Sequence, residues 1–273
     1  MIPVLFDYVR PGSVDEAIGV LVEHGDEAKL LAGGHSLLPL MKLRLATPSV
    51  LVDIGRLSEL SYVRDMGDHV AIGALTRHHD VHNDAVAVRD APLLATVAGR
   101  IGDPQVRHRG TIGGSLAHAD PASDLPGAVL ALGGTLVARG PSGEREIPAS
   151  EFFAGFLETV LAPDEVLVEI RVPKATGGHS YQKFVRRSQD WAIVGVAAAR
   201  VNGHVGVSLV NVAATPVRAG AVEEALAGGA PASEAAELAA DGLDPSGDNN
   251  ATPEFRRHLA RVLTKRALVE AGF

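Results

Sequence analysis

The chain contains no cysteine among its 273 residues. Without a thiol it forms no disulfide, and it supplies no thiolate ligand to zinc or to an iron–sulfur cluster. Disulfide-stabilised scaffolds, cysteine-based zinc sites and iron–sulfur proteins are therefore excluded as classes for this chain.

Long apolar runs and clusters of positive charge are also missing. No uncharged apolar run reaches the ~18 residues that a membrane helix requires, and the N-terminal segment MIPVLFDYVRPGSVDEA has early acidic residues and no signal-peptide core. Lysine and arginine are scattered, and the formal net charge of −8 disfavours non-specific binding of nucleic acid. We expect a cytoplasmic protein with no membrane span and no nucleic-acid partner, in which local geometry holds any anionic ligand.

Two common nucleotide-binding motifs are absent as well. No G-x-G-x-x-G follows an expected strand, and no G-x-x-x-x-G-K-[ST] occurs anywhere in the chain. The sequence therefore supports neither a Rossmann site nor a P-loop. A bound dinucleotide would need another scaffold.

The first sixty residues predict a β-α-β-α-β unit. After the strand VLFDYVR, Ser13 and Glu16 form a capping box for a helix whose apolar face includes Val22 and which ends at Gly25. The strand AKLL leads to a helix that begins at Ser36, and the strand SVLVDI completes the unit.

The rest of the chain predicts further strands and helices in two domains. The first domain extends to the expected boundary PKATGG. It has predicted strands on both sides of Met66-Gly67-Asp68, followed by helices over 80–91, 92–101 and 125–133. Further strands are predicted over 134–140, 144–149 and 165–173. Beyond this boundary come strands over 179–187, 192–201 and 205–213, the last two joined by Asn202-Gly203, a strong hairpin signal. Ala-rich helices follow, and then a helix from Pro253 with apolar Phe255, Leu259, Val262, Leu263 and Leu268 on one face and Arg256 elsewhere. We expect an α+β protein with domains at 1–175 and 178–273.

Two paired-glycine segments, AGGHS at 32–36 and TIGGS at 111–115, each precede an expected helix and are interpreted as strand-to-helix junctions. Glycine permits close approach of the backbone to a phosphate, and a helix start presents unpaired N–H groups with a partial charge of about +0.5. Together the two segments can hold a pyrophosphate without a lysine or arginine. The alternative for each is a simple tight turn.

Other reactive patterns are weaker. Ser115 in GGSLA resembles a nucleophile elbow, but Ala117 stands where G-x-S-x-G has its second glycine. His78, His79 and His82 offer helical spacing for zinc, but no glutamate completes H-E-x-x-H, so a solvated helix face is the favoured interpretation.

Two carboxylates, Asp120 and Asp124, bracket the sequence DPASD after the second glycine segment. A carboxylate beside a phosphate would repel it. The remaining roles are to accept a hydrogen bond from a ribityl or ribose hydroxyl, or to cap the helix at Leu125. Both roles stay open for Asp124.

Considered together, AGGHS with the following LLPLMKLRLATPSVLVDI, and RGTIGGSLAHADPASDLP at 109–126, resemble the FAD-binding medium subunit of the xanthine dehydrogenase family, especially of the carbon monoxide dehydrogenase type. The resemblance covers nearly the whole chain. It implies FAD as cofactor and a PCMH-type FAD-binding domain of two α/β lobes. From about residue 178 it implies a smaller α+β flavoprotein C-terminal domain with an antiparallel sheet and helices, including YQKFVRRSQDWAIVGVA.

The resemblance also implies which residues contact FAD, and it implies no catalytic residue and no metal ligand in this chain. The implied contacts are Ala32, Gly33, Gly34, His35, Ser36, Thr111, Ile112, Gly113, Gly114, Ser115, Asp124, Lys183 and Trp191. Lys183 matches the family's lysine near the flavin ring. Ser115 replaces the usual asparagine, so its contact would be shortened or bridged by water. Trp191 either packs on the isoalloxazine or fills a domain interface.

The function implied by the resemblance is electron transfer through FAD within a molybdenum hydroxylase. In this family a large subunit carries molybdopterin and a small subunit carries two [2Fe–2S] clusters, which suits a chain without cysteine. We expect a paired heterotrimer in which this chain passes electrons to an external acceptor. The alternatives are a self-contained PCMH-type flavin oxidoreductase and a non-catalytic nucleotide-binding subunit.

Overall fold

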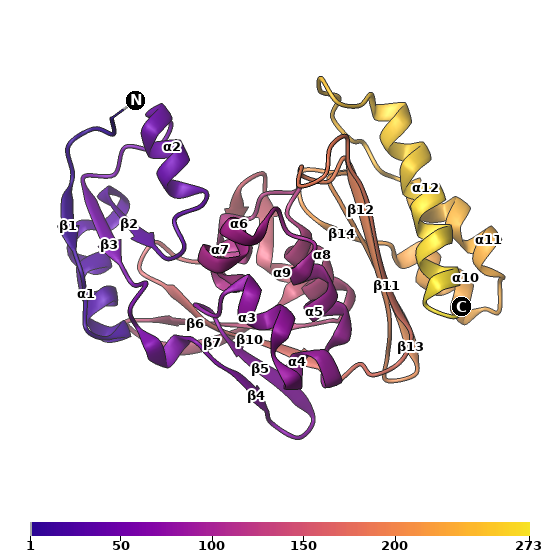
Figure 1. The fold of residues 1–273 in the computed structure, drawn as a ribbon, viewed down its shortest axis with the longest axis horizontal. Coiled ribbons are helices and arrows are strands. Elements are labelled where there is room, and N and C mark those ends of the chain that lie inside the picture. Colours follow the sequence, from indigo (N-terminus) through magenta and orange to yellow (C-terminus); the bar gives the residue numbers. More distant parts are fainter. Residues whose placement is uncertain (1) are drawn as a thin grey trace.

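The computed structural model describes residues 2–273, and its N-terminal lobe is a small parallel sheet with helices (Figure 1). The elements are β1 (Asp7–Val9), α1 (Val14–His24), the 3-10 turn η1 (Gly25–Glu27), β2 (Ala28–Leu31), α2 (Leu37–Leu43) and β3 (Val50–Asp53). The strands are parallel in the order β1-β3-β2, as the predicted β-α-β-α-β unit requires.

The start of α1 follows the predicted capping box with one change. The Ser13 hydroxyl accepts from the Glu16 N–H at 3.1 Å, but the Glu16 carboxylate accepts from Gly12 and not from Ser13 itself. Val22 is exposed, contrary to the prediction, because the buried face of α1 consists of Val14, Ala17, Ile18 and Leu21.

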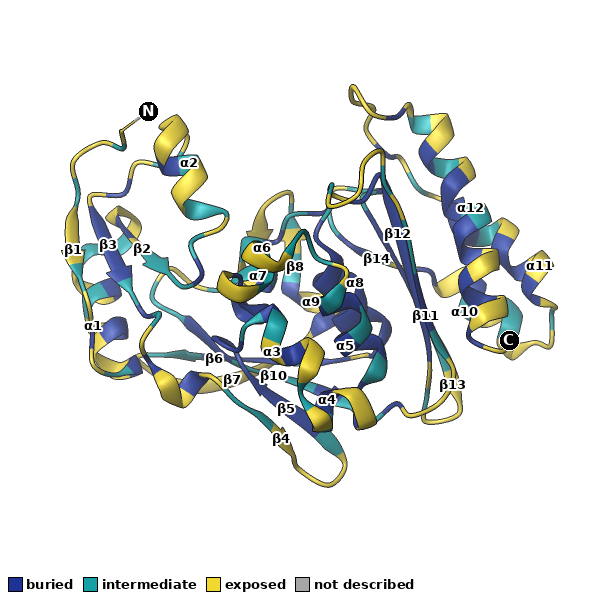
Figure 2. Cartoon of the chain, viewed as in Figure 1, coloured by how far each residue is buried: buried dark blue, intermediate teal, exposed yellow. Residues whose placement is uncertain are grey.

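A second lobe contains a five-stranded antiparallel sheet in the order β4-β5-β10-β6-β7. Its strands are β4 (Val63–Asp65), β5 (His69–Gly73), β6 (Thr135–Gly140), β7 (Gly143–Pro148) and β10 (Val166–Pro173). Figure 2 shows β5 buried in the middle of the lobe and the edge strand β4 largely exposed. The face of the sheet that carries Val137, Val166 and Val168 packs against the N-terminal lobe.

Helices cover the other face of this sheet. They are α3 (His78–Asn83), α4 (Ala85–Asp90), α5 (Pro92–Gly99), α6 (Pro104–Arg109), α7 (Ile112–His118) and α8 (Asp124–Ala131). The helix predicted over 80–91 is divided at Asp84, whose carboxylate accepts from Val86 and Ala87 and starts a new helix. Between residues 55 and 175, the elements that the sequence analysis did not predict are α6, η2 (Ser58–Leu60), α9 (Ala149–Phe152), β8 (Phe153–Gly155) and β9 (Glu158–Thr159).

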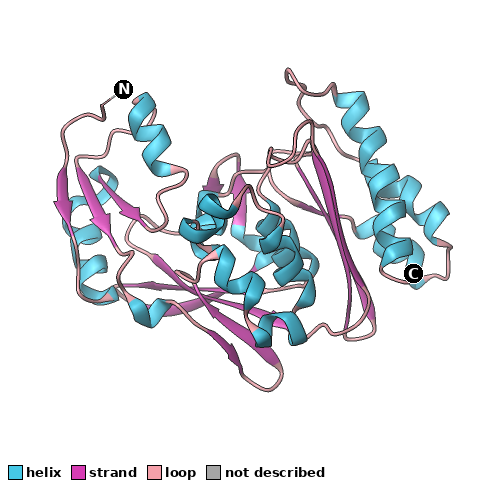
Figure 3. Cartoon of the chain, viewed as in Figure 1, coloured by secondary structure: helices cyan, strands magenta, loops and turns pink. Residues whose placement is uncertain are grey.

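The C-terminal part is an antiparallel sheet between two layers of helices (Figure 3). Its elements are β11 (His179–Phe184), β12 (Val194–Val201), β13 (His204–Val210), β14 (Val217–Arg218), α10 (Gly220–Ala227), α11 (Ala232–Ala235), η3 (Ala236–Ala240) and α12 (Pro253–Glu270). The predicted Asn202-Gly203 hairpin is confirmed, with φ of 50° and 84° at its two turn residues. The fold is therefore α+β, as predicted.

The amphipathic pattern of α12 holds for its leucines and fails at its first turn. Leu259, Leu263 and Leu268 are buried, but Phe255 is 40% exposed and Arg256 is 3% exposed. Arg256 is buried because its guanidinium donates to the carbonyls of Ile193 and Asn211 and to the Asp248 carboxylate. These acceptors lie on other segments, where helical periodicity gives no signal.

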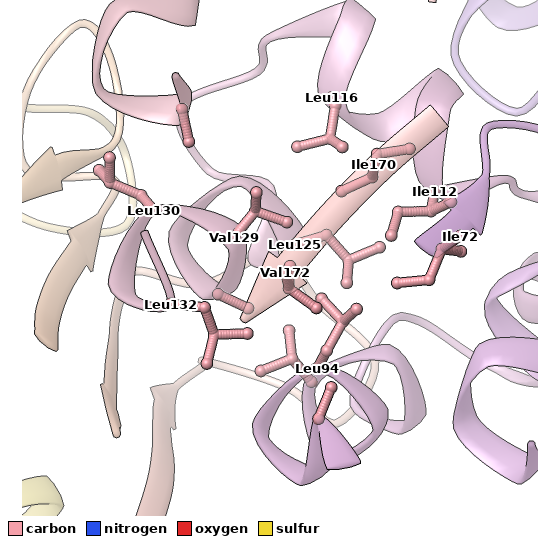
Figure 4. Close-up of a cluster of buried hydrophobic side chains, with 14 of the residues drawn as sticks. Ile72, Leu94, Ile112, Leu116, Leu125, Val129, Leu130, Leu132, Ile170 and Val172 are labelled. Carbon is pink, nitrogen blue, oxygen red and sulfur yellow. The ribbon is translucent and has the colours of Figure 1, made fainter. Parts of the chain in front are cut away.

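The largest core lies between β5, β10 and the helices of the second lobe. Figure 4 shows Ile72 and Ile170 from the strands facing Leu94, Ile112 and Leu125 from α5, α7 and α8. This core continues into Tyr181, Ala197 and Ala199 of the C-terminal sheet. No helix within residues 2–273 combines the length and apolar character needed to cross a membrane.

Candidate functional site

The first glycine segment joins β2 to α2 and carries a run of free backbone donors. Gly34 has φ +76°, a left-handed conformation that favours glycine. Five consecutive N–H groups find no acceptor among residues 2–273, namely those of Gly33, Gly34, His35, Ser36 and Leu37. Successive free N–H groups in such a turn form a concave site for an anion.

A cleft of about 220 Å³ lies beside this segment and is strongly basic. Its lining residues are Leu31, Ala32, Gly33, Leu38, Asp53, Gly55, Arg56, Arg77 and Arg109. Asp53 already accepts from the Tyr8 hydroxyl and from the Gly55 N–H. The lining therefore has three guanidinium groups against one occupied carboxylate, which favours an anionic ligand.

The three arginines were missed by the sequence analysis, which expected backbone groups alone to face the anion. Arg77 donates to the backbone carbonyl of Arg109 and shares an isolated β-bridge with Thr111. Burial, and then repulsion by Arg109, lowers the pKa of Arg77. A signal was present for Arg109, which stands two residues before Thr111 of the second glycine segment. The contribution of Arg77 depends on the tertiary bridge.

The second glycine segment differs from its prediction. It joins two helices, α6 and α7, so it is not a strand-to-helix junction, and the first N–H groups of α7 are already bonded. The four bonds run from Ile112 to the Thr76 carbonyl (3.0 Å), from Gly113 to the Ala74 carbonyl (2.8 Å), from Gly114 to the Thr111 hydroxyl (3.1 Å) and from Ser115 to the Thr111 carbonyl (3.0 Å). This segment therefore offers no free donors in its first helical turn.

The first glycine segment nevertheless touches the backbone that leads directly into the second. A Cβ on Gly33 would overlap the carbonyl oxygen of Arg109 and lie 3.0 Å from the Cα of Gly110. A Cβ on Gly113 would lie 2.5 Å from the Cβ of Ala74, so this glycine packs against the end of β5. The glycines are needed because chain segments meet here, whether or not a ligand is present.

Asp124 and Lys183 form a second group, buried between α8 and β11. The side chain of Asp124 is 6% exposed and accepts from Lys183 Nζ at 2.8 Å and from the Tyr181 hydroxyl. Lys183 also donates to the Arg100 carbonyl at 3.3 Å. Burial raises the pKa of Asp124, while the Lys183 ammonium opposes that shift.

The capping role considered for Asp124 is wrong. Asp124 is the first residue of α8 and the N-cap is Ser123. The carboxylate points to β11 and bonds no backbone N–H among residues 2–273. Asp120 instead accepts from the Ala122 N–H at 2.8 Å and closes a local turn.

Trp191 lies in the turn between β11 and β12 with 58% of its surface exposed. That exposure does not fit the filling of an interface within this chain. A large apolar ring in the open is available to a ligand or to another polypeptide.

Of the three histidines on α3, His78 departs from the solvated face that the sequence analysis favoured, whereas His82 is exposed and His79 is half-buried. His78 is 4% exposed, its Nδ1 has no hydrogen-bond partner among residues 2–273, and its ring edge packs on Gly110. Burial, with nearby positive groups, lowers its pKa to about 4. His82 bonds the Ala95 carbonyl through Nδ1. Within residues 2–273 there is no group of three or more His, Cys, Asp or Glu side chains arranged to hold a metal ion.

Comparison with known proteins identifies the family. Residues 4–175 match the model of the FAD binding domain in molybdopterin dehydrogenase, and residues 179–271 match the CO dehydrogenase flavoprotein C-terminal domain. The carbon monoxide dehydrogenase medium chain of Hydrogenophaga pseudoflava is 44% identical, over 98% of this chain and 97% of the relative. The 6-hydroxypseudooxynicotine dehydrogenase complex subunit alpha of Paenarthrobacter nicotinovorans is 37% identical, over 99% and 96%.

A solved structure agrees with these sequence relatives. A chain of carbon monoxide dehydrogenase from Hydrogenophaga pseudoflava superposes with a TM-score of 0.96 at 45% identity, covering 99% of this chain and 98% of that one. The matches in sequence and in fold extend over nearly the entire length of both partners. This chain therefore belongs to the family of FAD-binding medium subunits of the carbon monoxide and xanthine dehydrogenases.

Proposed function

We propose that this chain is the FAD-binding electron-transfer subunit of a molybdenum hydroxylase, which receives electrons from [2Fe–2S] clusters on a partner and passes them to an external acceptor. The observation that carries the proposal is the basic cleft beside five free backbone N–H groups. This donor set suits a pyrophosphate, which has two negative charges and many acceptor oxygens. When bound, FAD supplies the ability to accept electrons singly and release them in pairs.

The two glycine segments and the arginines of the basic cleft have different roles in holding FAD. Backbone groups of Ala32, Gly33, Gly34, His35 and Ser36 bind the pyrophosphate, and Arg56, Arg77 and Arg109 neutralise it. The second segment, Thr111, Ile112, Gly113, Gly114 and Ser115, supports the first through backbone packing and offers the hydroxyl of Ser115 to the ligand. This division follows from the bonded state of the first N–H groups in α7.

Asp124, Lys183 and Trp191 act at the other end of the ligand. Lys183 is held by Asp124 with its ammonium close to the flavin ring, and Trp191 packs on the isoalloxazine. A fixed positive charge beside the ring adjusts its electronic properties, and an aromatic side chain shields it from water.

The partners follow from what the chain lacks and from the names of its relatives. With no cysteine, it cannot hold the clusters that feed the flavin. Relatives are named as a medium chain and as a subunit of a dehydrogenase complex. We propose a molybdopterin-binding large subunit and a [2Fe–2S] small subunit as partners, in a paired heterotrimer.

We also propose the division into domains 1–175 and 178–273. The match to the first family model ends at residue 175, and the match to the second begins at residue 179. The short connection 174–178 joins β10 to β11 at the same place. Limited proteolysis with a broad-specificity protease and mass spectrometry of the fragments should find the first interdomain cut in that connection. Initial cutting inside β10 or β11 would contradict the division.

Reconstitution with FAD tests the function directly. The purified chain should bind about one FAD, contain neither iron nor molybdenum, accept electrons from dithionite and yield them to a dye. It should co-purify with a large and a small subunit from its host. Failure to bind FAD would favour a non-catalytic subunit, and turnover of an organic substrate by the lone chain would favour the self-contained flavin oxidoreductase.

An arginine variant tests the site within the same experiment. Arg109→Ala should weaken FAD binding by about 1.5 to 3 kcal/mol, the contribution of a hydrogen bond to a charged group, which is at least tenfold in Kd. Arg266→Ala is the matched control, because it removes the same charge from an exposed position of α12. Equal affinities for the two variants would remove the basic cleft from the FAD site.

A further inference from the structure

We propose that Tyr181 is a positioning residue of the flavin site, whose hydroxyl holds the Asp124 carboxylate so that the Lys183 ammonium keeps one fixed place. The inference rests on the proposed function and deepens it. The family resemblance includes the stretch YQKFVRRSQDWAIVGVA that begins at Tyr181, but it implies no FAD contact and no other role for this tyrosine.

The backbone places the three groups together. Tyr181 and Lys183 are two residues apart on β11, so their side chains lie on the same face of the sheet. That face packs against the start of α8, where Asp124 is the first helical residue. Asp124 uses Oδ1 for the Tyr181 hydroxyl and Oδ2 for Lys183 Nζ, at 2.8 Å in the latter case.

The arrangement is buried, so each bond in it is hard to replace with water. The exposed fractions are 6% for the Asp124 side chain, 8% for the Lys183 side chain and 4% for Tyr181. A buried carboxylate with one oxygen unpaired loses solvation without compensation. Removal of the tyrosine hydroxyl therefore frees Asp124 to turn, and Lys183 keeps only its bond to the Arg100 carbonyl as a second restraint.

The neighbouring strand leaves room for the hydroxyl. Gly195 is the partner of Lys183 in the β11–β12 register, and a Cβ there would lie 2.8 Å from the Tyr181 hydroxyl oxygen. A side chain at 195 would crowd both the Tyr181 hydroxyl and Val210, whose nearest methyl carbon would lie 2.5 Å from the added Cβ. The sequence of β12 thus supports the position of Tyr181.

A similar arrangement in the chain provides a matched control. The Tyr62 hydroxyl donates to Glu169 at 2.7 Å, and Glu169 also accepts from Arg171, so a tyrosine, a carboxylate and a cation again form a series. Glu169 and Arg171 lie on β10 of the five-stranded sheet, Tyr62 directly precedes β4, and none of the three is assigned to FAD. Tyr62→Phe removes the same kind of hydrogen bond at a place where the flavin should not sense it.

The test measures FAD affinity and the flavin midpoint potential in reconstituted protein. Tyr181→Phe should weaken FAD binding about tenfold and shift the potential to a more negative value, because a displaced ammonium stabilises added negative charge on the ring less well. Tyr62→Phe should change neither quantity. In a Lys183→Met background, Tyr181→Phe should no longer shift the potential, since the charge that it positions is gone.

The outcomes separate this inference from the proposed function. If the wild-type protein binds no FAD, the proposed function fails. If it binds FAD but Tyr181→Phe matches Tyr62→Phe in affinity and potential, or still shifts the potential in the Lys183→Met background, the positioning role is overturned. Should Tyr181→Phe fail to fold, 3-fluorotyrosine placed at 181 keeps the shape and strengthens the donor. It should shift the potential in the positive direction, and an unchanged potential would refute the role.

Discussion

Replacing Gly33 by alanine tests whether contact between the first glycine segment and the backbone leading into the second controls the ligand site. The added Cβ would overlap the carbonyl oxygen of Arg109 and lie 3.1 Å from its carbonyl carbon and 3.0 Å from the Cα of Gly110. The three nearest atoms all belong to the backbone, so no side chain can turn aside. That same carbonyl oxygen accepts the hydrogen bond of Arg77.

The expected cost follows from this overlap. Carbon atoms in contact prefer a separation of about 3.5 to 4.0 Å, so the second segment must move by roughly 0.5 to 1 Å. Overpacking of this kind costs about 1 to 3 kcal/mol. Because Arg77 and Arg109 move with the backbone, we expect FAD binding to weaken by a similar amount, about ten- to a hundredfold in Kd.

Titration of the apoprotein with FAD, followed by flavin fluorescence, measures this effect alongside urea unfolding. Gly19→Ala is the control, because a Cβ at this exposed position of α1 meets nothing within 4 Å. It should leave FAD affinity unchanged and raise stability by about 0.5 to 1 kcal/mol. If Gly33→Ala loses stability but binds FAD as tightly as Gly19→Ala, the two segments do not couple to the ligand as argued.

Three further predictions address other parts of the molecule. Burial lowers the pKa of His78 from 6.5 to about 4, so between these values the unfolded chain binds a proton that the folded chain does not. The free energy of unfolding should therefore fall as the pH drops below 6.5, by about 2 kcal/mol at pH 5. In urea unfolding, His78→Gln should show a smaller fall over the same pH range. A fall equal to that of the wild-type protein would contradict the role of His78. Asp124→Leu should destabilise the fold by about 3 to 5 kcal/mol because it leaves a buried lysine unpaired, whereas adding Lys183→Met should recover most of that loss in chemical denaturation. Bound FAD should quench Trp191 fluorescence, with recovery on stripping the flavin, and equal emission in both forms would place the ring away from it.

Several predictions from local patterns are confirmed where the signal and its consequence lie within one element, although Val22 of α1 is exposed against its helical pattern. The capping residue Ser13, the Asn202-Gly203 hairpin and the leucine face of α12 act over a few residues, and all three are present in the structure. The predictions failed where a distant partner decides the outcome. Arg256 is buried by carbonyls of Ile193 and Asn211, which helical periodicity cannot indicate.

The predictions for the candidate site also succeed where the signal is local and fail where a distant residue decides the outcome. The sequence located the first glycine segment and its free backbone donors, since glycine and a helix start have local consequences. It overestimated the second segment, because the N–H groups of Ile112 and Gly113 are used by the carbonyls of Thr76 and Ala74 on a distant stretch of chain. It also left Arg77 unnoticed, because no motif marks that residue.

The sequence by itself determined that this chain binds no iron–sulfur cluster through cysteine, that two glycine segments are present, and that the chain resembles the FAD-binding medium subunits. These conclusions need composition and short motifs alone. The tertiary structure decided which charged and polar groups contact one another. Gly33 contacts Arg109. Asp124 pairs with Lys183, 59 residues away in the sequence, and accepts from Tyr181, 57 residues away. Such contacts depend on how sheets and helices pack into a common core, and that packing is a property of the whole chain that no short stretch encodes.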